Sequence, residues 1–127
     1  MINNNYVPDW HTSPFEHVEY TLARNQLHMD ILFADMGDVD KFMSLDADAQ
    51  VNFYNDSTLA IVQIGDVERS IIQIHSLLLH EAVHIWQRVR TLMGETNPSS
   101  EFEAYSIQRI AQDLFAMYEE SEVSNVS

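Results

Sequence analysis

Residues 66–94 read DVERSIIQIHSLLLHEAVHIWQRVRTLMG, and this stretch decides the fold that we expect for the chain. Its apolar residues recur every three or four positions, which predicts a long helix from about residue 66 to residue 93. Gly94 can adopt the left-handed conformation in which many helices end, so we expect the helix to stop there. A helix this apolar should be largely buried against the rest of the fold.

The segments around this helix predict further elements. Residues 50–54 alternate in polarity and residues 58–64 are rich in β-branched and aliphatic side chains, which together predict a β-hairpin over 50–64. Helical periodicity returns after Asn97-Pro98 and continues to about residue 118. Ser13-Pro14 resembles a helix start, and the apolar residues of 15–33 fall at helical spacing. The expected fold class is therefore α+β: an N-terminal helix, a small antiparallel sheet with the hairpin, and two long packed helices.

The composition indicates one acidic globular domain. The chain has 127 residues and a mass of 14.7 kDa, which suffices for a single core, so we expect residues 1–127 to form one domain. The 20 acidic and 6 basic residues give a formal net charge of −14. Such a charge argues against binding to nucleic acid through its phosphates or to anionic membranes. It is compatible with a protein partner that binds an acidic surface.

Other general features narrow the class of protein. The chain has no cysteine, which excludes a disulfide scaffold, a cysteine zinc ribbon and a thiol nucleophile. We recognise no secretory signal and no apolar run long enough to span a membrane, so we expect a cytoplasmic protein. The acidic, serine-rich tail 119–127 is expected to fray.

The central helix contains His80-Glu81-Ala82-Val83-His84, which is the pattern H-E-x-x-H. Two histidines four residues apart lie on one helix face and can bind one zinc ion, while the glutamate lies beside the open position of the metal and can act as a general base. The chance expectation for this motif here is on the order of 2%, so its surroundings must support it.

The surroundings of the two histidines are unusual for a helix surface. A narrow stripe of short, uncharged polar side chains includes both of them, and the rest of the helix is nearly all apolar. We interpret this stripe as the lining of a cleft, because solvent faces more often carry Lys, Glu and Arg; a plain solvent face is the alternative. His75 lies about 140° from His80 around the helix and cannot share its metal. The stripe consists of Gln73, Ser76, His80, His84, Gln87 and Thr91.

A catalytic zinc ion needs a third protein ligand. The next helix offers Glu101 and Glu103 near its N-terminus. Helical spacing places Glu103 nearer the apolar face and Glu101 toward its edge. Acids in a first turn are also favoured by the helix dipole alone. The residues by themselves leave the choice between the two open.

These motifs carry a resemblance to a known family. An H-E-x-x-H helix with a hairpin before it and E-x-x-A on the next helix (Glu101 to Ala104) resembles the gluzincin type of zincin metallopeptidases in a minimal form. His-Ile-Trp-Gln (84–87) and Ser-Ser-Glu-Phe-Glu-Ala-Tyr (99–105) are similar to small metallopeptidase-like proteins of tailed bacteriophages. The resemblance covers about residues 50–118. It implies a zincin-like fold and, if the chain is phage-encoded, a location in the host cytoplasm.

The resemblance also implies a ligand set and an activity. The third zinc ligand maps to Glu101, with Glu103 as the alternative, and Tyr105 takes the position that supports the site, where many members have Asp or Asn. The implied reaction is hydrolysis of a peptide or protein: zinc activates water and polarises the scissile carbonyl, and Glu81 takes the proton. The strand over 58–64 is implied to pair with an extended substrate as an edge strand.

Two other functions stay open beside the metallopeptidase. One is a non-catalytic zincin-fold protein that binds a partner, for example in phage assembly. The other is an acidic inhibitor that imitates nucleic acid, which the charge allows, although acids spread through a sequence are usually a solvated surface. The intact Glu81 favours the enzyme, since a purely structural metal site needs no base there.

Overall fold

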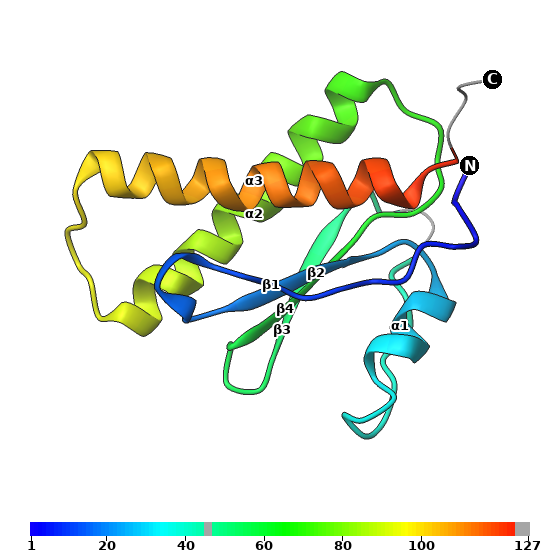
Figure 1. Ribbon diagram of the computed structural model, residues 1–127, viewed down its shortest axis with the longest axis horizontal. Coiled ribbons are helices and arrows are strands. Elements are labelled where there is room, and N and C mark those ends of the chain that lie inside the picture. Colours follow the sequence, from blue (N-terminus) through cyan, green and yellow to red (C-terminus); the bar gives the residue numbers. More distant parts are fainter. Residues whose placement is uncertain (45–46, 124–127) are drawn as a thin grey trace.

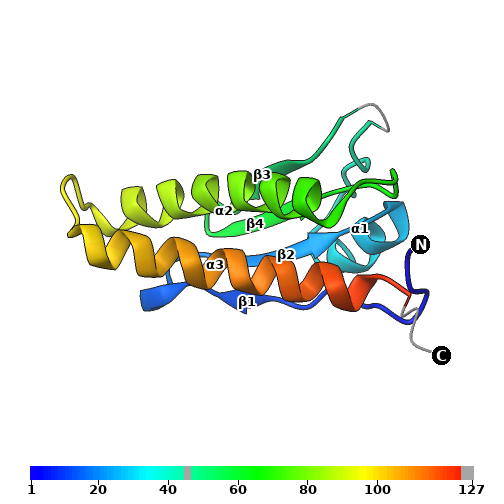
Figure 2. The ribbon, with the colours of Figure 1, turned by 90° about the horizontal axis from the view of Figure 1, so that it is seen from above.

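The computed structural model describes residues 1–44 and 47–123. A mixed four-stranded sheet lies between two long helices on one face and one short helix on the other, as Figures 1 and 2 show. The chain is therefore α+β, as predicted from the sequence. In chain order the elements are β1 (His11–Thr12), a 3-10 turn (Pro14–Glu16), β2 (Glu19–Ala23), α1 (Gln26–Leu32), β3 (Gln50–Tyr54), β4 (Leu59–Gln63), α2 (Ile71–Met93) and α3 (Ser100–Ser121).

The strand order is β1-β2-β4-β3, which makes β4 a central strand and β3 an edge strand. The predicted hairpin is confirmed, because β3 and β4 pair antiparallel with Val51 opposite Val62. The expectation of an antiparallel sheet is wrong in one pair: β2 and β4 run parallel, with Leu22 opposite Val62. Parallel strands need a long connection between them, and here α1 and β3 lie within it.

The helix predicted over 15–33 forms only in its C-terminal part, as α1, and the prediction is wrong for the residues before it. Ser13 and Pro14 begin only a 3-10 turn, then Glu19–Ala23 forms β2, and α1 starts after Asn25. Val18 and Leu22 are four residues apart, which fits a helix face and also one face of a strand. Tyr20 lies between them in the same core, while Ala23 packs in the core on the other face of the sheet, so the period is two. The Asn25 side chain then caps α1 by accepting from the His28 backbone N–H at 3.0 Å.

Each face of the sheet has its own core. The larger core packs alternate residues of β2 and β4, including Leu22 and Val62, against α2 and α3. The smaller core lies under α1 and includes Ala23, Met29 and Ile61. Because successive strand residues point to opposite faces, β4 is buried on both of its sides.

The two long helices begin and end where the local sequence favours it. Ser70 caps α2 in a capping box with Gln73: the Ser70 side chain accepts from the Gln73 N–H, and the Gln73 side chain accepts from the Ser70 N–H. Gly94 ends α2 with a φ of 71°, in the left-handed region that glycine adopts without strain. Ser99 caps α3. In the part of the chain that the structure describes, none of the helices has the length and apolar character needed to cross a membrane.

The end of α3 is held to the rest of the fold by Arg24, the residue after β2. Its fully buried guanidinium donates to the carbonyl groups of Ile64 and Gly65, to the Ser121 hydroxyl at 2.8 Å and to the Glu122 carboxylate at 2.8 Å. The prediction that the tail frays from residue 119 is thus wrong for 119–123, while residues 124–127 lie outside the described part of the chain.

Candidate metal centre

The side chains of His80 and His84 meet on the surface of α2, as their spacing predicts. Their Nε2 atoms are 3.1 Å apart, and both side chains are exposed. Two Zn–N bonds of about 2.0–2.1 Å in tetrahedral geometry hold their nitrogen atoms roughly 3.3 Å apart. The two ring nitrogens therefore stand close to the separation that a shared zinc ion requires.

Gln87 orients one ring of this pair. The Nδ1 atom of His84 lies 3.0 Å from the Gln87 side-chain oxygen, an acceptor, so Nδ1 carries the proton and donates it. In the neutral ring, the lone pair on Nε2 then accepts a hydrogen bond from His80 Nε2 at 3.1 Å. Loss of the His80 Nε2 proton would leave both lone pairs available to a metal. Gln87 belongs to the polar stripe predicted from the sequence, where no role was expected of it. Its position three residues after His84 is the signal for such a contact.

Glu81 lies on the buried side of the motif. Its side chain is only 5% exposed and makes no hydrogen bond or ion pair with the described residues. Burial raises the pKa of its carboxyl group, and the charges of His80 and His84, when these rings are protonated, lower it. A carboxyl group held near two imidazoles with a raised pKa has the character of a general base or acid.

The polar stripe of α2 faces solvent. All six of its side chains are exposed. The stripe is therefore better described as a plain solvent face than as the lining of a cleft. The sheet and α3 take up the opposite side of the helix, where Leu78 and Ile85 are fully buried. Other apolar residues of α2 are exposed as well, for example Ile72 at 74%, so the helix is less completely buried than its composition predicts.

The two candidate third ligands have different surroundings. Glu101 is exposed in the first turn of α3, whereas Glu103 is half-buried and accepts a hydrogen bond of 2.9 Å from the indole N–H of Trp86. The helical spacing thus placed both residues correctly relative to the core. Tyr105 is 61% exposed on α3.

The structure does not bring a third ligand to the histidine pair. Among residues 1–44 and 47–123, no cluster of three or more His, Asp or Glu side chains is placed to hold a metal ion. Trp86, to which Glu103 is bound, is buried on the side of α2 that faces α3, and the two histidines lie on the solvent side. Two ring nitrogens thus lie close together, and among the described residues no third His, Asp or Glu side chain lies with them in an arrangement that could hold a metal.

The strand beside the motif is β3. Arg88, one turn after His84, places its guanidinium 4.5 Å from the centre of the Phe53 ring in β3 and donates to the Ser57 hydroxyl in the hairpin turn. Helical spacing puts Glu81 on the same flank of α2. The expectation that 58–64 is the edge strand for a substrate is wrong, because β4 is paired on both sides. The strand that forms the edge on this side of the sheet is β3.

Comparison of the chain with protein-family models, with curated proteins and with solved structures finds no match.

Proposed function

We propose that the chain is a zinc-dependent, metallopeptidase-like protein that hydrolyses peptides. His80 and His84 hold the metal and Glu81 is the general base. The observation that carries the proposal is the convergence of the two Nε2 atoms, with one ring oriented by Gln87 and a buried carboxyl group next to them. Bound zinc supplies Lewis-acid polarisation of a carbonyl group and acidification of water.

Glu101 is the preferred third ligand in this proposal. Its side chain has no hydrogen bond in the described structure, so it can turn toward a metal without losing one. Glu103 would have to release the indole N–H of Trp86, which would then lose its only hydrogen bond. An unsatisfied buried donor costs about 1–3 kcal/mol, and this cost favours Glu101.

Glu81 accepts a proton from water during the reaction and passes it on to the leaving amine. A base works best when its pKa lies near the working pH, and burial moves the pKa of Glu81 in that direction. Helical spacing also puts it on the same flank of α2 as Arg88, which contacts β3, and an extended peptide can pair with the outer edge of that strand.

Zinc binding tests the first part of the proposal. We expect about one zinc ion per chain by elemental analysis, with an increase in melting temperature when zinc is added to metal-free protein. His80→Ala and His84→Ala should abolish both effects, and His75→Ala, on another face of α2, should retain them. Glu101→Ala should weaken zinc binding more than Glu103→Ala. Wild-type protein that takes up no zinc would overturn the proposal, and the reverse order of the two glutamate variants would make Glu103 the ligand.

Turnover by Glu81→Gln tests the base. The amide has the same shape as the carboxyl group but accepts no proton, so peptide hydrolysis should fall about a hundredfold or more. Zinc content should stay the same. Stability should not decrease, since the substitution removes a group whose charged form is disfavoured by burial. Equal turnover by the two proteins would show that Glu81 is not the base.

A second candidate function is a metal-binding protein that binds a partner without cutting it. The exposure of both histidines and the lack of a third ligand beside them within the described residues favour it. Wild-type protein that is loaded with zinc yet inactive on a broad peptide library would support this candidate over the enzyme.

A further inference from the structure

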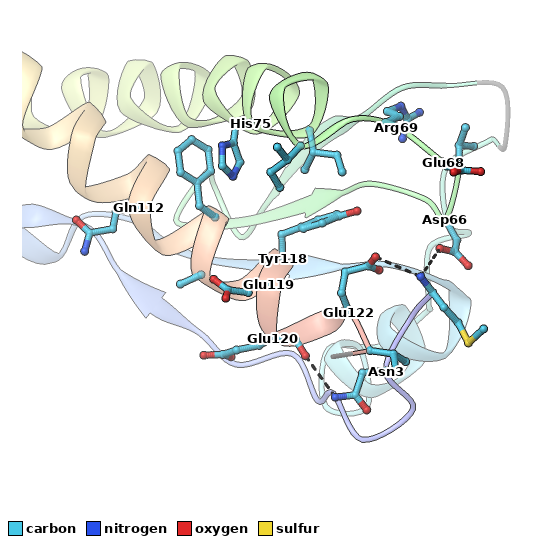
Figure 3. Close-up of a pocket in the computed structure, with 17 residues that line it drawn as sticks. Asn3, Asp66, Glu68, Arg69, His75, Gln112, Tyr118, Glu119, Glu120 and Glu122 are labelled. Atoms are coloured by element: carbon cyan, nitrogen blue, oxygen red, sulfur yellow. Dashed lines mark hydrogen bonds and ion pairs between the residues drawn. The ribbon is translucent and has the colours of Figure 1, made fainter. Parts of the chain in front are cut away.

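A large groove separates the N-terminal half of α2 from the C-terminal half of α3. The two helices cross obliquely (Figure 1), and the groove between their splayed ends has a volume of about 1570 Å³. Small-molecule sites typically measure about 300–1,000 Å³, so this groove has room for a segment of another macromolecule. His75, which has no place in the metal centre, lies in it (Figure 3).

The floor of the groove is apolar and partly exposed. His75 stacks on Phe115 with ring centres 4.3 Å apart, which joins α2 to α3 across the groove. One turn earlier, Ile71 is 57% exposed, and the buried Ile74 and Tyr118 lie beneath. An isoleucine that lines a groove and stays this exposed leaves apolar surface for a partner to cover.

The rim of the groove is acidic, and its charges are only partly balanced within the chain. Asp66 and Glu122 form ion pairs with the buried Arg24. Glu68, before α2, and Glu119, on the last turn of α3, have no ion pair among the described residues. The last turn of α3 itself carries no basic residue. The cation beside its negative C-terminal end is Arg24, which already pairs with Glu122.

We propose that this groove binds a basic amphipathic helix of a partner protein, whose apolar side covers Ile71 and Phe115 and whose Lys or Arg side chains reach Glu68 and Glu119. A third helix packed against two splayed ones follows the usual mode of helix recognition in an apolar groove. The net charge of the chain favours a basic partner over a second copy of the same chain as the occupant of the groove. A second copy of this chain would bring its own net charge of −14 to an acidic rim and would be repelled.

A designed peptide tests this inference. The probe is a peptide of about 18 residues, or five helical turns, with leucines on one face and lysines on the other. We expect one peptide to bind per chain with a dissociation constant of about 10 μM or tighter. Amide signals of residues 68–75 and 112–119 should shift in NMR spectra. A peptide of the same composition, arranged without a separate apolar face, should bind at least about tenfold more weakly. Its lysines can still pair with the acidic rim, but it has no continuous apolar surface to cover the floor of the groove.

Matched variants distinguish binding of the peptide in the groove from its nonspecific attraction to an acidic protein. Glu119→Lys and Glu68→Lys should each weaken binding about tenfold or more. Glu95→Lys makes the same charge change in the loop after α2 and should have a much smaller effect. Ile71→Ser should weaken binding, and Ile72→Ser, which changes an exposed neighbour outside the groove, should not.

Three outcomes would overturn the inference: no binding, equal effects of Glu95→Lys and Glu119→Lys, or a concentration-dependent dimer that buries the groove instead. The result is independent of the metal centre, because His75 and the His80–His84 pair lie on different faces of α2. His84→Ala should therefore bind the peptide like the wild type.

Discussion

His28 and Glu81 are both buried ionisable side chains, and burial moves their pKa values in opposite directions. It raises the pKa of the Glu81 carboxyl group, and it lowers the pKa of the His28 ring, with a further lowering by the charge of Arg24. The His28 ring is 2% exposed and accepts the Arg24 backbone N–H at Nδ1, at 2.9 Å. At neutral pH both groups are therefore held closer to their neutral forms than they would be in water.

The buried His28 ring should make the stability of the fold depend on pH. The pKa of His28 is lower in the folded chain than its value of about 6.5 in the unfolded one. Its contribution to stability is therefore present above pH 6.5 and is lost as the pH falls through the folded-state pKa. Between pH 7 and pH 5 the melting temperature of the wild type should fall more steeply than that of His28→Asn, whose side-chain oxygen can still accept the Arg24 N–H. Parallel curves would contradict this, and the exposed His75→Gln should behave like the wild type.

At the scale of elements, Arg24 joins three segments that are far apart in the sequence. From the end of β2 it binds the carbonyl groups after β4 and the residues that end α3, and its guanidinium lies 4.4 Å from the centre of the Tyr118 ring. Arg24 therefore links the last residues of α3 to the ends of β2 and β4, beside the bridge that the N-terminal segment makes to Glu122. A buried charge of this kind is costly unless its donors are used. Here four of the five N–H groups of the guanidinium donate to four separate acceptors.

Removal of Arg24 should be far more damaging than removal of an exposed arginine. Arg24→Met should lower the free energy of unfolding by about 3–5 kcal/mol, because the carbonyl groups of Ile64 and Gly65 lose their buried donor and Glu122 keeps only its ion pair with the exposed N-terminal amino group. Arg109→Met is the matched control: Arg109 is half exposed and lies 3.6 Å from Asp113, so its loss should cost less than about 1 kcal/mol. Chemical denaturation measures both values. Equal costs would show that the Arg24 contacts do not stabilise the fold.

At the scale of the whole molecule, the charge of −14 sets the response to salt. Repulsion among excess like charges destabilises a compact state, and salt screens it. At pH 7 the melting temperature should rise when the salt concentration is increased from about 0.01 M to about 1 M, over which the Debye length falls from about 30 Å to about 3 Å. The increase should be smaller near pH 4.4, the isoelectric point. A melting temperature that falls with salt at pH 7 would mean that attractive ion pairs outweigh the repulsion.

The sequence by itself determined the elements whose signals are local. The β3–β4 hairpin, both long helices and the stop at Gly94 follow from side-chain periodicity and from turn and cap residues within a few positions. The approach of His80 to His84 follows from their spacing on one helix, and the half-buried place of Glu103 follows from the apolar face of α3. Each of these features depends on residues close together in the chain, so a short stretch of sequence is enough to predict it.

Only the tertiary structure decided features that depend on partners far away in the sequence. Val18 and Leu22 fit a helix and a strand equally well, and the parallel partner β4, about 40 residues later, makes β2 a strand. The same pairing moves β4 to the centre of the sheet and leaves β3 at its edge. Which side of α2 faces solvent is decided by the sheet and α3, which cover the other side. The polar stripe is therefore exposed to solvent. Packing against distant segments, and not the composition of the helix, determines which of its faces is buried.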